Sequence, residues 1–370
     1  MRIAMLGHKR VPSREGGVEV VVEELAVRMV ERGHQVTVFN RSGHHVSGRE
    51  FDGKKLNEYK GIQLKTVPAI NVKGIAAMTA SAFASICAAF GRFDLVHFHT
   101  EGPCATLWLP KLVGKRCVVT VHGLDHQRSK WGRLARVYIM LGERCAAKYA
   151  DEIIVLSRSV QQYFKEHYNR ETVLIPNGVT RVLPKKADQI QHTFGLNKDD
   201  YILYLGRITP EKGIHYLIEA YKGLDTDKKL VIAGGASDSD AYFEEIKAMA
   251  EGNHNILFTG FVQGQMLEEL YSNAYIYVLP SDLEGMPLSL LEAMSYGNCC
   301  VVSDIPENSD VVGKIGVTFR KGLSKELCIC LQELCDKPET VSGYKNKASD
   351  FIYRKYSWDE VTDKTMQCYQ

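Results

Sequence analysis

Two glutamates eight positions apart, Glu284 and Glu292, are of the residue type and spacing that could hold a ligand between them. The apolar run at 274–279 is typical of a buried parallel strand, and Pro280 would end it. From Pro287 onward the apolar residues recur at helical spacing, which predicts a helix. The stretch therefore predicts a strand, a loop that carries Glu284 and a helix that carries Glu292.

The start of that helix is a second ligand-binding feature. It is formed by Gly285, Met286, Pro287 and Leu288. Backbone amides at a helix N-terminus attract anions, because they are unpaired and the helix dipole is positive there. Carboxylates on both sides of an anion site suit a ligand with a phosphate core and hydroxyl groups at both ends. A nucleotide sugar is such a ligand.

Two cations upstream could serve the same ligand. Arg207 and Lys212 flank a turn that follows the predicted strand 201–205 and enters a helix. Cations placed near a helix N-terminus can neutralise a diphosphate leaving group. Asp238-Ser-Asp240 has the form of an Asp-x-Asp metal motif, but it precedes a helical pattern, and helix capping accounts for it. We therefore expect no metal site there.

The N-terminal loop combines small and basic residues. Gly16 and Gly17 stand where a helix begins, so a phosphate or sugar could approach the backbone amides closely. A flexible turn would account for the two glycines equally well. Lys9, Arg10 and Arg14 share the loop and could meet an anionic acceptor, or lie on a solvated loop.

Two histidines follow neighbouring predicted strands. Strands and helices alternate through the first half of the chain, which indicates a doubly wound parallel sheet. His99 follows the strand at 94–98 and His122 the strand at 116–121, so both fall at the sheet edge where such folds bind ligands. His97 and His99 would share a strand face, but no third metal ligand is evident. His122 is the better catalytic candidate, and a strand-end histidine bonded only to backbone is the alternative.

The loop after His122 is polar, basic and aromatic. It carries Asp125, Arg128 and Trp131. Trp131 could stack on a sugar ring while Asp125 accepts hydroxyl protons, or the loop could be a lid with Trp131 packed inward.

The Glu284-x7-Glu292 stretch resembles the hallmark of glycosyltransferase family 4, whose members are retaining enzymes of the GT-B fold. The stretch at 204–213 is similar to the same family's phosphate motif, and Gly16-Gly17-Val18-Glu19 resembles a subgroup labelled rhamnosyltransferase-like. The resemblance implies an α/β fold of two Rossmann-like doubly wound domains with an active-site cleft between them. It also implies that Glu284 faces the donor sugar, Glu292 holds the ribose and His122 approaches the reacting centre.

These interpretations divide the candidate residues into three sets. The catalytic set is His122 and Glu284. The donor-binding set is Gly16, Gly17, Arg207, Lys212, Glu284, Gly285, Met286, Pro287, Leu288 and Glu292. The acceptor-side set is Lys9, Arg10, Arg14, His99, Asp125 and Arg128.

The length of 370 residues fits two domains better than one. We expect an N-terminal acceptor-side domain at 1–180, a linker at 181–197 and a C-terminal donor-binding domain at 198–352. By the same resemblance, residues 353–370 form a helix that crosses back to the first domain.

Charge is divided unevenly between the two halves. Residues 1–180 hold 26 Lys and Arg against 16 Asp and Glu, a net +10, although the whole chain is only +2. A basic half indicates an anionic partner such as a membrane surface, a lipid phosphate or nucleic acid; uneven surface charge without consequence is the alternative. No nucleic-acid-binding module is recognisable, so we expect peripheral, salt-sensitive association with an anionic membrane.

The ten cysteines lie mostly in apolar runs, which fits free thiols in a reducing cytosol. The N-terminal apolar run is too short for a signal peptide, and the one at 75–90 is shorter than the roughly 20 residues that span a bilayer. We therefore expect a cytoplasmic protein, with peripheral association at the inner face of the plasma membrane.

Together these features predict a hexosyltransferase that moves a sugar from a nucleotide sugar to a saccharide acceptor. A lipid-linked acceptor in cell-surface polysaccharide synthesis is the favoured case, with no cofactor and no metal. A nucleotide-sugar epimerase or isomerase on the same fold is an alternative that would leave the basic half unexplained. A non-catalytic nucleotide-sugar-binding partner subunit is another, and it would have no reason to keep Arg207, Lys212, Glu284 and Glu292 together.

Overall fold

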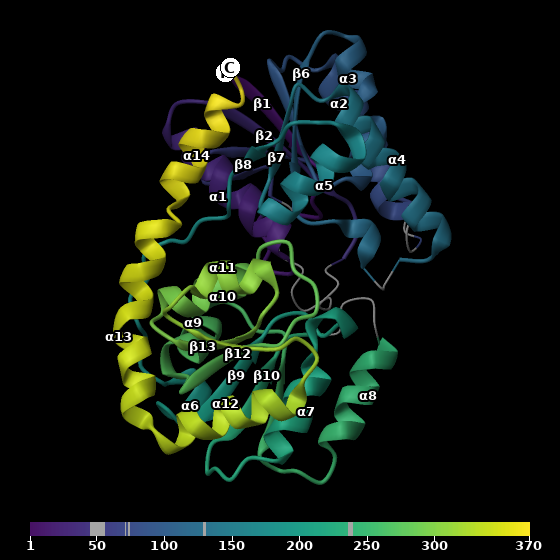
Figure 1. Cartoon of the computed structure of the whole chain (residues 1–370). Coiled ribbons are helices and arrows are strands. Elements are labelled where there is room, and N and C mark those ends of the chain that lie inside the picture. Colours follow the sequence, from purple (N-terminus) through teal and green to yellow (C-terminus); the bar gives the residue numbers. More distant parts are fainter. Residues whose placement is uncertain (45–55, 71, 73–74, 129–130, 236–239) are drawn as a thin grey trace. The chain divides into compact units, whose positions relative to one another are not determined.

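The computed structural model describes residues 1–44, 56–70, 72, 75–128, 131–235 and 240–370 (Figure 1). The chain divides into two compact units. The first comprises Met1–Gly178 and Trp358–Gln370, and the second comprises Val179–Ser357. Each unit is a sheet of mainly parallel strands with helices packed against it, as the alternating pattern of the sequence predicts.

The sheet of the first unit has the strand order β3-β4-β2-β1-β5-β6-β7-β8 in the described part of the chain, and only the β3–β4 pair is antiparallel. The strands are β1 (Arg2–Leu6), β2 (Gln35–Arg41), β3 (Glu58–Tyr59), β4 (Ile62–Val67), β5 (Leu95–His99), β6 (Arg116–Val121), β7 (Glu152–Val155) and β8 (Val173–Leu174).

The helices of the first unit are α1 (Gly17–Glu31), α2 (Ile75–Phe90), α3 (Trp108–Leu112), α4 (Arg133–Tyr149), α5 (Arg158–Tyr168) and α14 (Trp358–Gln367), with short 3-10 turns η2 (Gly102–Thr106) and η3 (Asp125–Gln127). Local chemistry fixes several of their ends. Ser157 caps α5 by accepting from the backbone N–H of Val160, and Asn169 ends it in the left-handed conformation.

The C-terminal helix α14 belongs to the first unit although it follows the whole second unit in the chain. It packs against α1, where Asp363 lies 2.9 Å from Arg32. Just beyond the helix, the hydroxyl of Tyr369 lies 2.6 Å from His97 Nδ1, and the carbonyl of Cys368 accepts from Arg116 at 3.1 Å. Buried contacts therefore hold the C-terminus in the first unit's core. The return to that unit occurs at Trp358 and not at 353, because α13 (Pro338–Lys355) still packs in the second unit.

The sheet of the second unit has the order β11-β10-β9-β12-β13-β14, and all of its described pairs are parallel. Its strands are β9 (Tyr201–Leu205), β10 (Lys229–Ala233), β11 (Ile256–Gly260), β12 (Ile276–Leu279), β13 (Cys299–Ser303) and β14 (Val317–Phe319). The remaining helices are α6 (Gln189–Phe194), α7 (Ile214–Lys222), α8 (Asp240–Ala250), α9 (Gly264–Asn273), α10 (Leu288–Ser295), α11 (Pro306–Val312) and α12 (Ser324–Asp336), with the 3-10 turn η4 (Pro210–Lys212).

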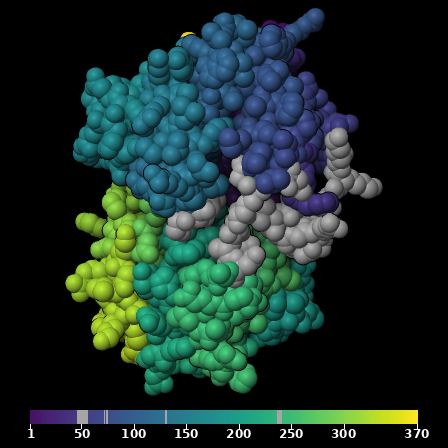
Figure 2. All heavy atoms as spheres, turned by 90° about the vertical axis from the view of Figure 1, so that its right-hand side faces the viewer, coloured from purple at the N-terminus to yellow at the C-terminus, as the bar shows by residue number. Residues whose placement is uncertain are grey.

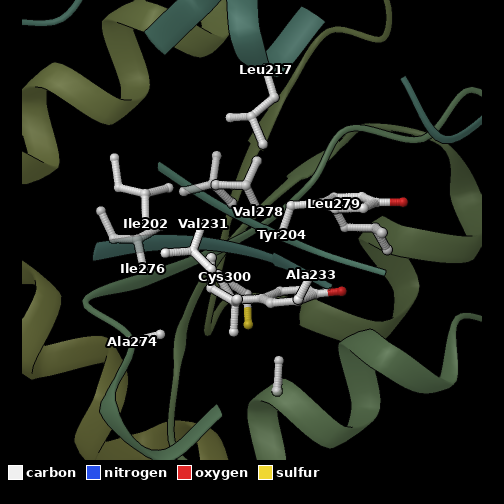
Figure 3. Close-up of a cluster of buried hydrophobic side chains, with 14 of the residues drawn as sticks. Ile202, Tyr204, Leu217, Val231, Ala233, Ala274, Ile276, Val278, Leu279 and Cys300 are labelled. Atoms are coloured by element: carbon white, nitrogen blue, oxygen red, sulfur yellow. The ribbon is translucent and has the colours of Figure 1, made fainter. Parts of the chain in front are cut away.

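The core of the second unit is built on its central strands. Side chains of Ile202, Val231 and Ile276 cluster around the sheet in Figure 3. Two large tyrosines are buried among them, and each places its hydroxyl on a backbone carbonyl: Tyr201 on Leu270 at 2.7 Å and Tyr204 on Arg207 at 2.8 Å. Such pairing removes the cost of burying a phenol and fixes the loops that follow the strands.

The expected linker at 181–197 is part of the second unit. Helix α6 lies within it, and Ile190 and Leu196 are fully buried in that unit's core. The buried carboxylate of Glu269 also accepts from the backbone N–H groups of Asp188 and Ile190. The segment was interpreted as a linker because it is polar, but two apolar anchors and one carboxylate are enough to hold it.

Two further sequence predictions concern a helix cap at Asp238 and membrane-spanning segments. Asp238 lies outside the described residues, and α8 begins at Asp240, so the capping role stays a prediction. Within the described ranges no helix has the length and apolar character needed to cross a membrane.

Candidate donor-binding and catalytic site

The second unit has a topological switch point between β9 and β12. From β9 the chain moves outward to β10 and β11 on one side, and it returns to place β12 on the other side. In open parallel sheets, ligands bind beyond the carboxyl ends of the strands at such a point. The loop after β9 carries Arg207 and Lys212, and the loop after β12 carries Glu284. Topology therefore brings these three candidates to one sheet edge.

The two loops are joined along their backbones. The N–H of Asp282 donates to the carbonyl of Glu211 at 2.9 Å. Gly213 has a φ of +67°, and a Cβ there would lie 2.2 Å from the carbonyl oxygen of Pro280. Only glycine combines that conformation with so close an approach. The glycine that ends the sequence motif at 204–213 thus lets the two loops meet.

Lys212 and Glu284 form an ion pair at this junction. Lys212 Nζ lies 2.6 Å from Glu284 Oε1, and the side chains are 13% and 7% exposed. The Ser281 hydroxyl donates to the same carboxylate oxygen at 2.7 Å. From the sequence, Lys212 was predicted to bind phosphate and Glu284 to face the donor sugar. The structure shows them in direct contact, so each fixes the position of the other.

Glu292 is held on α10 by a neighbouring helix. The hydroxyl of Tyr271, on α9, lies 3.3 Å from Glu292 Oε2. The Tyr271 ring in turn stacks on Tyr296 with centroids 5.5 Å apart. Sequence reasoning missed Tyr271, because a tyrosine on a half-apolar helix carries no sign of which carboxylate it contacts.

The residues between the two glutamates form the start of α10. Gly285 and Pro287 are buried, while Met286 and Leu288 pack half-buried against the core. The carbonyl of Pro287 accepts from the N–H of Leu290 and of Leu291 at 3.2 Å each. The helix therefore begins where the proline predicts, four residues after Glu284.

The first unit has its own switch point, between β1 and β5. Gly7, directly after β1, has a φ of +107°, and a Cβ there would lie 2.1 Å from the carbonyl oxygen of His99. The loop after β1 is further held by Asn40, whose side chain accepts from the N–H of Val11 at 2.9 Å and donates to the carbonyl of Val11 at 2.8 Å. Asn40 also lies 3.1 Å from His8 Nε2. Sequence reasoning missed this asparagine because it looked like an ordinary strand residue.

The start of α1 is occupied by a side chain of its own. The buried carboxylate of Glu19 accepts from the N–H of Lys9 at 2.8 Å. A Cβ on Gly16 would lie 2.5 Å from Glu19 Oε2. Gly16 therefore makes room for Glu19, whereas donor binding by Gly16 and Gly17 stays a prediction. Arg10 donates to the carbonyl of Gly43, so this cation of the loop already has a partner within the chain.

Three buried histidines run from the C-terminus to the candidate catalytic position. His97 Nδ1 lies 2.6 Å from the Tyr369 hydroxyl, and the His97 and His99 rings are 4.2 Å apart. His99 Nδ1 lies 3.1 Å from His122 Nε2. Thr120 completes the set, with its hydroxyl 2.8 Å from His97 Nε2.

Burial sets the charge of these rings. It lowers the pKa of His97 to about 3 and that of His122 to about 4, and it lowers the pKa of His99 well below its ordinary value. All three are neutral near pH 7, so His99 and His122 share one proton between their facing nitrogens. A neutral His122 can donate or accept a hydrogen bond with a sugar hydroxyl but brings no positive charge. His97 serves as a bonded core residue, and no group of three metal-binding side chains occurs in the described residues.

The loop after His122 is paired within itself. Arg128 Nε lies 2.8 Å from Asp125 Oδ1, and the N–H of Asp125 donates to Glu101 at 3.0 Å. Burial is the main cause that raises the pKa of Glu101 well above its ordinary value. Asp125 and Arg128, predicted as acceptor-side residues, are therefore one ion pair beside the buried carboxyl group of Glu101.

Two units of this kind, each with a Rossmann-like sheet of mainly parallel strands, have the architecture of the GT-B fold. The family models agree. "Glycosyltransferase Family 4" matches residues 15–181, and "Glycosyl transferases group 1" matches residues 186–348. The chain belongs to glycosyltransferase family 4. The rhamnosyltransferase-like subgroup stays a prediction.

Similar proteins match the chain over all or part of its length. An uncharacterized glycosyltransferase of Methanocaldococcus jannaschii is 24% identical over 100% of this chain and 98% of its own length. The UDP-Gal:alpha-D-GlcNAc-diphosphoundecaprenol alpha-1,3-galactosyltransferase of Escherichia coli is 30% identical over 60% of each chain.

Solved structures show the same fold. Sucrose-phosphate synthase of Thermosynechococcus elongatus has a TM-score of 0.84 at 19% identity, covering 100% of this chain and 98% of its own. HepE of Anabaena, solved in complex with UDP-glucose, has a TM-score of 0.81 at 18% identity, covering 99% and 98%.

Proposed function

We propose that the chain transfers a glycosyl group from a nucleotide sugar to a saccharide acceptor, with retention at the anomeric carbon. The observation that carries the proposal is the Lys212–Glu284 pair at the switch point of the second unit. An ammonium held there meets a diphosphate, and a carboxylate beside it meets sugar hydroxyls. The UDP-glucose bound to Anabaena HepE, which shares this fold, supports a donor of that class.

In the proposed reaction, the bond between the anomeric carbon and the diphosphate oxygen breaks while the acceptor oxygen bonds to the same face. The acceptor proton passes to the leaving phosphate oxygen. Lys212 and Arg207 stabilise the negative charge that grows on the diphosphate. Glu292, braced by Tyr271, holds the ribose hydroxyls. Neutral His122 hydrogen-bonds the donor sugar.

We propose that no divalent metal takes part. The two cations of the β9 loop provide the positive charge that a metal would otherwise bring to the diphosphate. Donor and acceptor are then the only small molecules that the reaction needs.

The proposed acceptor is a saccharide on a lipid diphosphate, and the proposed role is cell-surface polysaccharide synthesis in the cytoplasm. The name of the E. coli relative specifies such an acceptor. A hexose is the favoured transferred group, since that relative transfers galactose.

A product assay tests the proposal. The chain is incubated with each of UDP-, GDP-, ADP- and dTDP-sugars, with and without an undecaprenyl-diphosphate-linked N-acetylglucosamine, and the products are separated by mass. We expect one donor to lose its nucleoside diphosphate and to extend the acceptor. An isomerised donor formed without acceptor would overturn the proposal in favour of an epimerase or isomerase. Absence of any product with every donor would also contradict it.

A further inference from the structure

Helix α2 buries its small residues and exposes its large apolar ones, which is the reverse of an ordinary surface helix. Its buried face consists of small residues, namely Ala80, Ser81, Ala84, Ser85, Ala88 and Ala89. Its bulky apolar residues point away from the sheet and are exposed: Ile75, Met78, Phe83, Ile86 and Phe90. Since α2 has no charged residue, the outer face is apolar along its whole length. A helix that only covered a sheet would bury its large side chains and expose polar ones.

Two further helices continue this surface. Trp108 and Leu112 are exposed on α3, Val113 directly after it, and Leu134, Val137 and Leu141 on α4. These residues and those of α2 make up eleven of the nineteen large apolar side chains that are exposed among the described residues. Monomeric proteins expose such residues singly, so their concentration on three helices indicates a binding surface.

The three helices are neighbours on the first unit. Helix α2 contacts α3 and η2, and both of these contact α4. The Ser85 hydroxyl also lies 2.7 Å from the Thr106 hydroxyl, which ties α2 to η2. Figure 1 shows the three helices on one side, and Figure 2 turns that side to the viewer. We call the outer face of α2, α3 and α4 the apolar–basic face.

The charges on this face have one sign. Four basic side chains are exposed on α4, namely Arg133, Arg136, Arg144 and Lys148. The only acidic residue on the three helices, all of whose residues are described, is Glu143, and it is fully buried. Its carboxylate oxygens bind His126, Tyr163 and Tyr168 within the chain. The exposed charge of the face is therefore purely positive.

We propose that the apolar–basic face docks on an anionic phospholipid bilayer, with the helices lying in the plane of the interface. Apolar residues that project outward match the boundary between headgroups and acyl chains, and basic residues beside them match anionic headgroups. The most exposed apolar residues of this face are Leu134 at 87%, Phe90 at 80% and Leu112 at 75%, and one lies on each helix. This contact differs from association through charge alone, because it includes insertion of apolar side chains.

Docking of this kind would hold the first unit where a lipid-linked saccharide lies. The inference about the bilayer does not rest on the proposed transferase reaction, since it is measured as binding in the absence of donor and acceptor. A failure of docking leaves the donor-binding proposal intact, and the reverse also holds.

Vesicle sedimentation with the full chain tests the proposal. The vesicles are phosphatidylcholine alone, or phosphatidylcholine with about a third phosphatidylglycerol, at low and high salt. We expect binding to the anionic vesicles that weakens at high salt without vanishing, because apolar insertion is not screened. Equal absence of binding to both vesicles would overturn the proposal.

Two double variants separate the two parts of the contact. Leu134→Ser with Val137→Ser removes apolar area, and we expect the partition coefficient to fall by about tenfold or more. Arg133→Gln with Arg136→Gln removes two charges, and we expect a fall of about fivefold per residue together with a weaker dependence on salt. All four residues are exposed, so folding is unaffected and circular dichroism should show no change.

Matched controls lie in the second unit. Leu183→Ser with Ile329→Ser removes exposed apolar residues elsewhere, and Lys186→Gln with Lys198→Gln removes exposed charges elsewhere. We expect both controls to bind like the wild type. Equal losses in the control and test variants would overturn the proposal. A concentration-dependent dimer that Leu134→Ser with Val137→Ser abolishes, with no vesicle binding, would also overturn it and assign the face to a second copy of the chain.

Discussion

Replacing Lys212 by alanine should lower turnover by more than its loss of stability explains. A cation that meets the leaving diphosphate acts mainly in the transition state, and losing one such contact costs on the order of 3–4 kcal/mol, or about 100- to 1,000-fold in kcat. The same substitution leaves Glu284, 7% exposed, with its Ser281 hydrogen bond but without its ion-pair partner. An uncompensated and mostly buried carboxylate costs about 1–3 kcal/mol of unfolding free energy.

A matched control separates chemistry from folding. Lys345 also pairs with a carboxylate, that of Asp199, and donates to the carbonyl of Ala274 at 2.7 Å, within the same unit but on α13. Lys345→Ala should keep its kcat, and loss of its ion pair should cost about 1 kcal/mol or less in urea unfolding, because Asp199 is 42% exposed. The neutral pair Lys212→Met with Glu284→Gln should recover stability to within about 1 kcal/mol, because no unpaired charge remains, while turnover stays low.

The assay is the release of nucleoside diphosphate at saturating donor, with urea unfolding run in parallel. The reasoning is refuted if Lys212→Ala keeps its kcat within about threefold of the wild type. It is equally refuted if Lys345→Ala loses as much activity as Lys212→Ala, because the loss would then come from destabilisation. A second variant follows from the sequence prediction that Asp238 caps a helix. Asp238→Ala should lower the unfolding free energy by at most about 1 kcal/mol and leave turnover unchanged.

Three further predictions concern metal, backbone and pH. Excess EDTA should leave the initial rate unchanged, whereas a loss restored by magnesium or manganese would contradict the metal-free proposal. Gly213→Ala should lower the unfolding free energy by at least about 1 kcal/mol, since its Cβ would lie 2.2 Å from the Pro280 carbonyl oxygen at a φ of +67°. The control Gly343→Ala has open space around it and should not lower the unfolding free energy. Equal losses in urea unfolding for the two variants would contradict the prediction. Burial lowers the pKa of His97 to about 3, so the unfolded chain binds its proton first as pH falls from about 6.5, and stability should drop across that window. His97→Gln should flatten the drop, and an unchanged slope would count against it.

The sequence allowed the local elements of the site to be predicted, because they depend on patterns within a few residues. The strand before Pro280 and the helix after Pro287 were expected from apolar periodicity and proline position, and both are present as β12 and α10. Lys212 and Glu284 were predicted to serve the same ligand, and the parallel sheet does bring their loops to one edge.

What could not be predicted are the pairings between distant residues. Lys212 and Glu284 are 72 positions apart, and nothing local indicates that they form a pair. The contact of Tyr271 with Glu292 likewise depends on how α9 packs beside α10. The prediction of a linker was wrong for a related reason. Residues 181–197 are mostly polar, and their composition does not indicate that Ile190 and Leu196 anchor the segment in the core.

The prediction from the net charge of residues 1–180 also missed contacts within the chain. It counted Arg10 and Arg128 as cations facing an acceptor or a membrane, but Arg10 donates to the carbonyl of Gly43 and Arg128 pairs with Asp125. Arg133 and Arg136, which the same prediction counted, are exposed on α4 together with Arg144 and Lys148, beside apolar side chains that a count of charges cannot reveal.

The most direct test of the central claim is donor binding to the second unit. Thermal unfolding of the full chain is followed with UDP-, GDP-, ADP- and dTDP-sugars, in the wild type, in Lys212→Ala and in Lys345→Ala. A ligand at about 100 times its dissociation constant adds about 2.7 kcal/mol of stability, which is readily measured. The account predicts that one nucleotide series raises the melting temperature of the wild type and of Lys345→Ala by the same amount, and that of Lys212→Ala by less. An equal shift in Lys212→Ala, or no shift with any nucleotide sugar, would contradict it.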